Sequence, residues 1–305
     1  MTDKGKNVQA SFDKALSDVA AKLGHTPVVD LGGDVWGKLE GKNPAGSIKD
    51  RAAFYIIADA LESGALREGA PVVEATSGNT GIGLAYVGRL LGFRVILTMP
   101  ESMSSERREM LKSYGAELVL TPASDGMNGA VAKAKDIVGK TGGFFADQFG
   151  NPSSVKAHYE TTAPEIFRQL PDVAAIVAGV GSGGTAMGIK KYVTDNGLNC
   201  KVFALEPAES PLMSEGYAAP HLIQGIGANF LPSIVDPSAF DGIVTVRGED
   251  AVKGVGELFR KFGIKVGISS AAAVIGARNL ADKVQGKILA ILPDNGDRYP
   301  ADLYR

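Results

Sequence analysis

Short apolar runs alternate with longer segments of helical apolar spacing along most of the chain, and this order constrains the fold more than any other feature. In the first series, the runs expected to form strands are Pro71 to Ala75, Arg94 to Met99, Glu117 to Leu120 and Gly143 to Ala146. The helical segments between them are Gly81 to Leu91, Ser105 to Tyr114 and Ala130 to Val138. Parallel strands need crossover connections, which helices provide, so the order predicts a parallel sheet covered by helices.

A second alternating series follows Asp147 to Ser154, the most turn-rich break in the middle of the chain. Its expected helices are Val155 to Leu170, Thr185 to Val193, Glu249 to Phe262 and Ser270 to Val284. Its expected strands are Ala174 to Ala178, Val202 to Leu205, Ile243 to Val246 and Lys287 to Leu292. A less regular segment after Leu205 continues to Gly242.

The length of the chain agrees with two such series. Domains usually contain about 150 residues, so a chain of 305 residues has room for two cores. We therefore expect an α/β protein with two doubly wound parallel-sheet domains, in which ligands bind at the carboxyl ends of the strands. The expected divisions are residues 1–41 (an N-terminal arm and strands that contribute to the larger domain), 42–150 (a smaller α/β domain) and 151–305 (the larger domain).

The N-terminal arm contains one expected helix and two short expected strands. Phe12 to Leu23 is weakly amphipathic and ends at Gly24, which is typical of a helix C-terminus. Val28 to Leu31 and Val35 to Leu39 have the composition of strands.

Charge and cysteine content exclude several function classes. The chain has 32 Lys and Arg against 34 Asp and Glu, so no long-range field favours nucleic acid or an anionic membrane. The single cysteine, Cys200, precedes an apolar run and is interpreted as structural, and its isolation fits a reducing compartment. The N-terminus does not resemble a signal peptide, and no apolar run approaches the ~20 residues that span a bilayer. We therefore expect a cytoplasmic protein without membrane or nucleic-acid partners.

Metal and serine-hydrolase chemistry have no support in the motifs. His25, His158 and His221 lack the paired spacing of metal ligands, so no metal site is expected. No G-x-S-x-G elbow follows an expected strand, which argues against a Ser-His-Asp hydrolase.

The turn from Gly179 to Thr185 follows an apolar strand and opens a helix, so its backbone amides can converge on a phosphate. It satisfies G-x-G-x-x-G through Gly179, Gly181 and Gly184, and Glu206 ends the next strand about 20 residues later, as the dinucleotide fingerprint requires. A nicotinamide or flavin enzyme is therefore one hypothesis, although this fingerprint usually follows the first strand of its domain. A turn whose glycines only allow close packing is the alternative.

The turn from Glu74 to Gly81 has a different character, because hydroxyls and an amide replace most of the glycines. Thr76, Ser77 and Thr80 at a helix start suit a carboxylate, although Ser77 or Thr80 could instead be plain helix caps. Two anion sites in two domains suggest one ligand that bridges a cleft. In a third turn, Gly267 to Ala271, a serine could cap the helix or offer a neutral hydrogen bond to a ring nitrogen.

Lys49 lies in a turn that opens a helix. Asn43-Pro44 and Ala45-Gly46 are turn formers, and the apolar residues after Arg51 have helical spacing. Taken alone, this pattern favours a solvated lysine in the first helical turn, because lysines are usually exposed.

Five motifs, in this order and spacing, resemble those of the cysteine synthase and cystathionine β-synthase family of pyridoxal phosphate enzymes. They are N-P-A-G-S-I-K-D-R, T-S-G-N-T-G, G-S-G-G-T, Q-G-I-G and G-I-S-S, and they cover nearly the whole chain. The resemblance implies the fold type II architecture of these enzymes, which is similar to that of the tryptophan synthase β-subunit. It also makes Lys49 the Schiff-base lysine.

The resemblance implies a role for each turn. The cofactor phosphate would be bound in the larger domain by Gly181, Ser182, Gly183, Gly184 and Thr185. The ring hydroxyl would contact Asn79, and the pyridine nitrogen would face Ser269. The substrate carboxylate would be held by Thr76, Ser77, Gly78, Thr80 and Gln148, with Gln224 and Gly225 near the amino acid's side chain and Asn229 as a further substrate-binding residue.

The implied mechanism is covalent catalysis with an electron sink. The substrate amine displaces Lys49, whose freed amine removes the α-proton, and loss of the β-leaving group gives an aminoacrylate to which sulfide or a thiol adds. A neutral Ser269 does not support protonation of the ring nitrogen as an aspartate would, which favours prompt β-elimination. Binding of the substrate carboxylate should close the smaller, mobile domain and exclude water.

The resemblance therefore implies formation of L-cysteine from O-acetyl-L-serine, or another activated serine, and sulfide. Cystathionine formation and sulfide release from cysteine are sibling alternatives, and a NAD-dependent dehydrogenase or a non-catalytic ligand-binding protein are distant ones. Asn229 stands where many cysteine synthases have glycine and several relatives of the sibling classes have aspartate, and Ala271 replaces a usual glycine, so the leaving group and nucleophile stay open. The family implies a homodimer, and some members bind the C-terminal tail of serine acetyltransferase.

Overall fold

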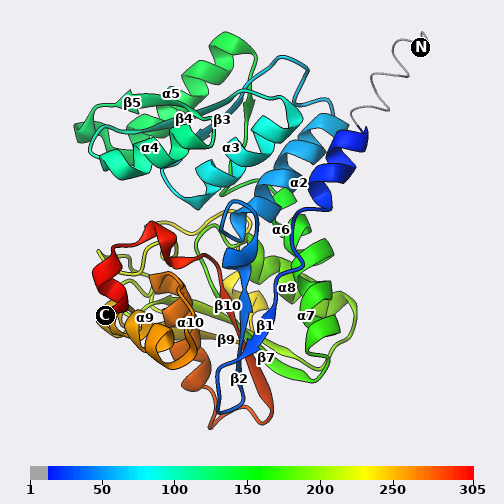
Figure 1. The fold of residues 1–305 in the computed structure, drawn as a ribbon, viewed down its shortest axis with the longest axis vertical. Helices are drawn as coiled ribbons and strands as arrows, with labels where there is room; N and C mark the ends of the chain where they lie inside the picture. Colours follow the sequence, from blue (N-terminus) through cyan, green and yellow to red (C-terminus); the bar gives the residue numbers. More distant parts are fainter. Residues whose placement is uncertain (1–12) are drawn as a thin grey trace. The chain divides into compact units, whose positions relative to one another are not determined.

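The computed structural model describes residues 13–305, which fold into two compact units (Figure 1). The first unit contains residues 13–23 and Lys49–Ser153, and the second contains Gly24–Ile48 and Ser154–Arg305. Phe12, the first residue of the expected N-terminal helix, lies outside the described residues. Within the described residues the helix extends from 13 to 20, so the expected end at Leu23 is wrong, because Lys22 and Leu23 donate to carbonyls only three positions earlier and form turns.

The first unit is built on a four-stranded parallel sheet in the order β5-β4-β3-β6. The strands are β3 (Val72–Ala75), β4 (Val95–Pro100), β5 (Glu117–Thr121) and β6 (Phe144–Phe145). The helices are α2 (Lys49–Glu62), α3 (Asn79–Leu91), α4 (Ser105–Ser113) and α5 (Gly126–Thr141), with a 3-10 turn η2 (Ala123–Asp125) before α5. The predicted alternation and the parallel sheet are confirmed here.

The second unit contains a six-stranded sheet in the order β1-β2-β10-β7-β8-β9. Its strands are β1 (Val28–Asp30), β2 (Val35–Leu39), β7 (Val173–Gly179), β8 (Lys201–Pro207), β9 (Gly242–Val246) and β10 (Lys287–Leu292). Only the β1–β2 pair is antiparallel among the described pairings of this sheet, and a short turn joins these two strands, as antiparallel pairing allows.

Helices cover both faces of the second sheet. They are α6 (Ser153–Ala157), α7 (Ala163–Gln169), α8 (Gly184–Asp195), α9 (Gly248–Phe262) and α10 (Ile268–Arg278). Along β7, Ala175 and Val177 pack in the core under α9 and α10, whereas Ile176 and Ala178 pack in the core under α7 and α8. This two-residue alternation with apolar side chains on both faces is what a doubly wound sheet requires.

Two helices differ from their expected extent. The helix expected from Val155 to Leu170 is interrupted by a π-helical segment η3 (His158–Thr162), in which the Ala163 N–H donates to the His158 carbonyl. Pro164 follows directly and has no N–H to donate to the residue four positions earlier, which accounts for the break in the regular ladder. Helix α10 ends at Arg278 rather than Val284, since Asn279 opens a series of turns and is a poor helix former.

Short 3-10 turns complete the second unit: η1 (Glu40–Lys42), η4 (Pro237–Ala239), η5 (Gly296–Arg298) and η6 (Ala301–Tyr304). The segment between β8 and η4 contains no helix or strand, in agreement with its irregular pattern. No helix within residues 13–305 is both long and apolar enough to cross a membrane.

Candidate active site

The glycine-rich turn of the second unit joins β7 to α8 and has the backbone geometry of an anion site. Gly183 has a φ of 90°, a left-handed conformation that favours glycine, and helix α8 begins at the next residue. A side chain on Gly181 would collide with the Gly225 carbonyl, so this turn also needs a second glycine. The first N–H groups of α8 have no intrahelical acceptor, and such groups bind phosphate.

The loop that contains Gly225 packs against this turn. The Gly227 N–H donates to the Val180 carbonyl at 2.9 Å, and the Gly225 carbonyl lies beside Gly181. The structure therefore brings Gly225 to the glycine-rich turn, as expected for one site, while Asn229 is exposed further along the same loop.

His158 is a buried residue behind the turn that sequence reasoning did not select. Its Nε2 lies 3.2 Å from Thr185 Oγ1, and its Nδ1 lies 2.9 Å from Thr162 Oγ1. The π-helical segment places the ring there, and Gly188 of α8 allows this close approach because a Cβ would lie 2.7 Å from the His158 Cβ. The imidazole therefore lies within hydrogen-bond distance of the Thr185 hydroxyl.

The start of α10 presents two buried serines. Gly267 is the N-cap, and no side chain caps this helix, so the interpretation of a serine as a plain cap is wrong here. Ser269 is 4% exposed, and the neighbouring Ser270 Oγ is buried without a hydrogen-bond partner. A buried hydroxyl at a helix start is a neutral group suited to a ring nitrogen.

The second anion turn lies in the first unit between β3 and α3. Gly78 is the N-cap of α3 without a side-chain cap, so Ser77 and Thr80 are not simple caps. Instead, the Thr80 hydroxyl donates to Gln148 Oε1 at 2.6 Å, and the Gly78 N–H donates to Thr76 Oγ1 at 3.2 Å. The structure thus brings Gln148 to the hydroxyl-rich turn with which it was grouped.

Glu74 joins the same group of residues and was not selected from the sequence. Its Oε1 accepts from the Ala75 N–H at 2.8 Å, and its Oε2 accepts from the Gln148 N–H at 3.0 Å. Burial raises the pKa of the Glu74 carboxyl to about 7, against the opposing effect of the two N–H donors. The charge of Asp147 raises this pKa further.

Lys49 is the first residue of α2, as the turn pattern predicted. Its side chain is partly buried, and desolvation lowers the pKa of its ammonium to about 8. Gly83 of α3 lies against the Lys49 carbonyl, where a Cβ would be 2.9 Å away, so these two helices pack closely at this lysine. An ordinary solvated lysine does not have these properties. With a pKa of about 8, the neutral fraction of this amine near pH 7 is far larger than that of an ordinary lysine, so it can act as a nucleophile and base.

The predicted site residues fall into one set in each unit. The first unit carries Lys49, Thr76, Ser77, Gly78, Asn79, Thr80 and Gln148. The second unit carries Gly181, Ser182, Gly183, Gly184, Thr185, Gly225, Asn229 and Ser269. Their roles remain predictions.

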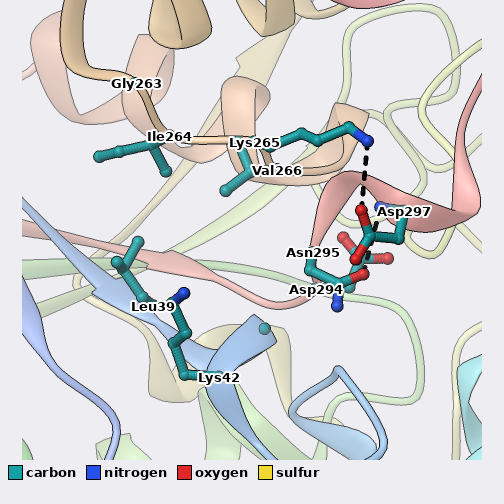
Figure 2. A pocket seen from close by; sticks show the side chains of 10 residues that line it. Leu39, Lys42, Gly263, Ile264, Lys265, Val266, Asp294, Asn295 and Asp297 are labelled. Atoms are coloured by element: carbon teal, nitrogen blue, oxygen red, sulfur yellow. Dashed lines mark hydrogen bonds and ion pairs between the residues drawn. The ribbon is translucent and has the colours of Figure 1, made fainter. Parts of the chain in front are cut away.

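A separate cavity of about 290 Å³ lies within the second unit near the carboxyl ends of β2 and β10 (Figure 2). Figure 2 shows the ion pair of 3.1 Å between Lys265 and Asp297 at this cavity. The cavity is lined by Leu39, Gly41, Lys42, Gly263, Ile264, Lys265, Val266, Asp294, Asn295 and Asp297. It contains none of the predicted site residues.

Each unit carries groups whose chemistry suits a part of pyridoxal phosphate. In the second unit, the N–H groups of the glycine-rich turn suit a phosphate and the buried Ser269 hydroxyl is a neutral group. In the first unit, the Lys49 amine has a lowered pKa. No group of three His, Cys, Asp or Glu side chains within residues 13–305 is arranged to hold a metal ion.

A family profile described as pyridoxal-phosphate dependent enzyme matches residues 19–294. The chain therefore belongs to this family of pyridoxal-phosphate dependent enzymes, and the nicotinamide interpretation of the glycine-rich turn is wrong. The resemblance drawn from the five motifs is confirmed.

Relatives of the chain within this family include cysteine synthases and a hydrogen sulfide-producing enzyme. Cysteine synthase B of Campylobacter jejuni is 46% identical over 292 residues, which cover 94% of this chain and 97% of that protein. The crystal structure of cysteine synthase from Entamoeba histolytica aligns with a TM-score of 0.89 at 36% identity, over 94% of this chain and 90% of that one. A hydrogen sulfide-producing enzyme from Fusobacterium nucleatum aligns with a TM-score of 0.91 at 37% identity, over 96% of this chain and 92% of its own.

Proposed function

We propose that this protein forms L-cysteine from O-acetyl-L-serine, or another activated serine, and sulfide. The observation that carries the proposal is the 46% identity to a cysteine synthase over nearly the full length of both chains. Bound pyridoxal phosphate supplies an electron sink that stabilises negative charge at the substrate α-carbon. The residues of this chain bind the cofactor and substrate, and one of them moves the proton.

Lys49 is the proposed Schiff-base lysine and the base that removes the α-proton. Two features support this role: its position at the start of α2, and burial that lowers its pKa to about 8. Because a base works best when its pKa lies near the working pH, this amine is suited to accept a proton near neutrality.

The proposed cofactor contacts lie mostly in the second unit. The N–H groups and hydroxyls of the turn would hold the phosphate through Gly181, Ser182, Gly183, Gly184 and Thr185. The Ser269 hydroxyl would face the pyridine nitrogen, and Asn79 would bond to the ring hydroxyl. A neutral serine would leave the ring nitrogen without a carboxylate partner, which would limit how long the bound cofactor stabilises negative charge and supports β-replacement over transamination.

The proposed substrate contacts begin with the hydroxyl-rich turn. The carboxylate would be bound at the start of α3 by Thr76, Ser77, Gly78, Thr80 and Gln148. Unsatisfied helix N–H groups and neutral hydroxyls bind a carboxylate well, which supports the assignment. Gly225 and Asn229 would lie near the amino acid's side chain and select the leaving group.

The cofactor assignment is tested by borohydride reduction of the purified yellow protein followed by peptide mapping. The label should appear on the peptide that contains Lys49, and Lys49→Ala should lose it. A label on another lysine, or a colourless protein after incubation with pyridoxal phosphate, would contradict the assignment.

Sulfide release from cysteine is the second candidate, because the chain aligns with a hydrogen sulfide-producing enzyme at a TM-score of 0.91. Cystathionine formation from serine and homocysteine is tested in the same experiment. The specificity constants for O-acetylserine, serine and cysteine are compared in wild type, Asn229→Gly and Asn229→Asp. If serine or cysteine exceeds O-acetylserine by more than about tenfold, or ~1.4 kcal/mol in transition-state binding, the lead assignment is wrong.

We also propose a cytoplasmic homodimer. Buried Cys200 is compatible with a reducing compartment, and dimers are what the family implies. Light scattering coupled to size exclusion measures the mass of the assembly, and fractionation of cells measures its location.

We further propose that the C-terminal tail of serine acetyltransferase binds in the active site. Competition between the amino-acid substrate and a peptide of this tail tests the proposal.

A further inference from the structure

Glu74 occupies an unusual position for a carboxylate. It lies within β3, is 2% exposed, and uses both carboxylate oxygens to accept backbone N–H groups. One donor, Ala75, ends its own strand, while the other, Gln148, is distant in sequence. A buried carboxylate carries a large desolvation cost, so this arrangement needs a compensating role.

Glu74 fixes the segment that presents Gln148 to the hydroxyl-rich turn. The neighbouring Asp147 has a φ of 50°, a left-handed backbone conformation that few residues other than glycine adopt. The Gln148 N–H is bound by Glu74, and the Gln148 side chain is bound by the Thr80 hydroxyl at the start of α3. The carboxylate therefore connects the end of β3, the Asp147–Gln148 turn and the first turn of α3.

We propose that Glu74 is a positioning residue whose ionised form holds Gln148 against the start of α3 and so sets the affinity for the substrate carboxylate. The link to affinity rests on the proposed function, since it requires that Thr80 and Gln148 bind that carboxylate. The structural link, in which the ionised carboxyl holds the Gln148 N–H, does not depend on the reaction.

The ionisation state of Glu74 changes near neutral pH. Burial raises its pKa to about 7, the Gln148 and Ala75 N–H groups lower it, and the charge of Asp147 raises it. Above this pH the carboxylate accepts two charge-assisted hydrogen bonds, and below it the neutral acid accepts more weakly. The charge-assisted hydrogen bond from the Gln148 N–H to Glu74 is thus present at high pH and is lost as the pH falls through about 7.

The test uses holoenzyme and L-methionine, an amino acid without a β-leaving group, with its methyl ester as a ligand that lacks the carboxylate. Dissociation constants are measured from the change in cofactor absorbance for wild type and Glu74→Gln. We expect Glu74→Gln to bind methionine about tenfold more weakly than wild type at pH 8, and about equally at pH 6, because the neutral side chains then match. For the ester, the dissociation constants of Glu74→Gln and wild type should be about equal at both pH values.

Glu117→Gln is the matched control, because Glu117 is an exposed carboxylate on β5 of the same unit. It should bind methionine as wild type does. The proposal is overturned if the ratio of Glu74→Gln to wild type is the same at pH 6 and pH 8, or if the ester shows the same change as methionine.

Hydrogen exchange in the unliganded wild type separates this proposal from the reaction. Protection of the Gln148 amide, corrected for intrinsic exchange, should fall about tenfold between pH 8 and pH 6, whether or not Glu74→Gln folds. Constant protection contradicts the positioning role. Protection that falls as expected, with no spectral response to any amino acid, retains the positioning role and rejects the proposed substrate site.

Discussion

The Lys38 ammonium lies 2.9 Å from the Glu165 carboxylate in the interior of the second unit, where the Lys38 side chain is fully buried. The same ammonium also donates to the Thr26 carbonyl at 2.6 Å and to Gln169 Oε1 at 2.9 Å. Through Glu165 and Gln169 the ammonium attaches β2 to α7, and through Thr26 it attaches β2 to the segment before β1.

Replacement of Lys38 by Met should destabilise the protein by about 3–5 kcal/mol, because Glu165 would then be a buried charge without its cation. The free energy of unfolding is measured by urea denaturation. Lys112→Met removes an exposed pair with Glu109 and should cost less than about 1 kcal/mol. Equal costs for the two variants would show that the Lys38 pair is not desolvated as described.

Replacement of Thr80 by Val should weaken amino-acid binding about tenfold while kcat changes much less, because the hydroxyl that orients Gln148 is lost. Steady-state kinetics separate KM from kcat. Thr121→Val is the control, since the Thr121 hydroxyl is buried in the same unit without a hydrogen-bond partner. An effect of Thr121→Val as large as that of Thr80→Val would remove the case for the Thr80–Gln148 contact.

Attachment of the cofactor to apoprotein should accelerate as the pH rises to about 8 and then level off, because burial lowers the pKa of Lys49 to about 8 and the neutral amine is the nucleophile. The rate is measured by the growth of cofactor absorbance.

The lowered pKa of Lys49 also makes stability depend on pH, because the unfolded chain binds more protons than the folded one between about 8 and the ordinary lysine value of 10.5. The free energy of unfolding of the apoprotein should therefore rise relative to that of Lys49→Met as the pH rises through this window. An attachment rate without an inflection near pH 8 would contradict the assignment of Lys49 as the lysine that binds the cofactor.

Replacement of Gly181 by Ala should reduce affinity for pyridoxal phosphate by more than about tenfold, since the added methyl group meets the Gly225 carbonyl and displaces the turn. Equilibrium titration of apoprotein measures the affinity. Gly139→Ala adds a methyl group to α5 where no atom lies within 4 Å, and it should keep wild-type affinity. It should also stabilise the helix by up to about 1 kcal/mol.

The architecture could be predicted because its signals are local. Alternating strand and helix patterns in β3 to α5 and in β7 to β10 depend on residues a few positions apart. The structure contains these elements with shifts of a few residues at most of their ends, and α10 is the exception because it ends at Arg278 rather than Val284. The π-helical segment was not predicted, since the pattern around Pro164 still has helical spacing.

Site residues that act through distant partners could not be predicted in the same way. His158 contacts a threonine 27 positions away, and Glu74 contacts an N–H group 74 positions away. Neither pair has a spacing that a motif would reveal, because tertiary packing brings them together. Lys49 is intermediate, since its position at a helix start was readable from the sequence while its lowered pKa comes from burial in the fold.

The pairing of β2 with β10 has a consequence for synthesis on the ribosome. These strands lie side by side in the second unit, blue beside red in Figure 1, although Val35 and its partner Ile288 are roughly 250 positions apart. Every strand of the first unit's sheet lies between β2 and β10 in the sequence. That sheet can therefore form before β10 has been synthesised, while one edge of β2 is still unpaired. The nascent chain therefore has an unpaired β2 edge until β10 leaves the ribosome. An unpaired strand edge can pair with other chains, so we expect the risk of aggregation to be highest during this interval.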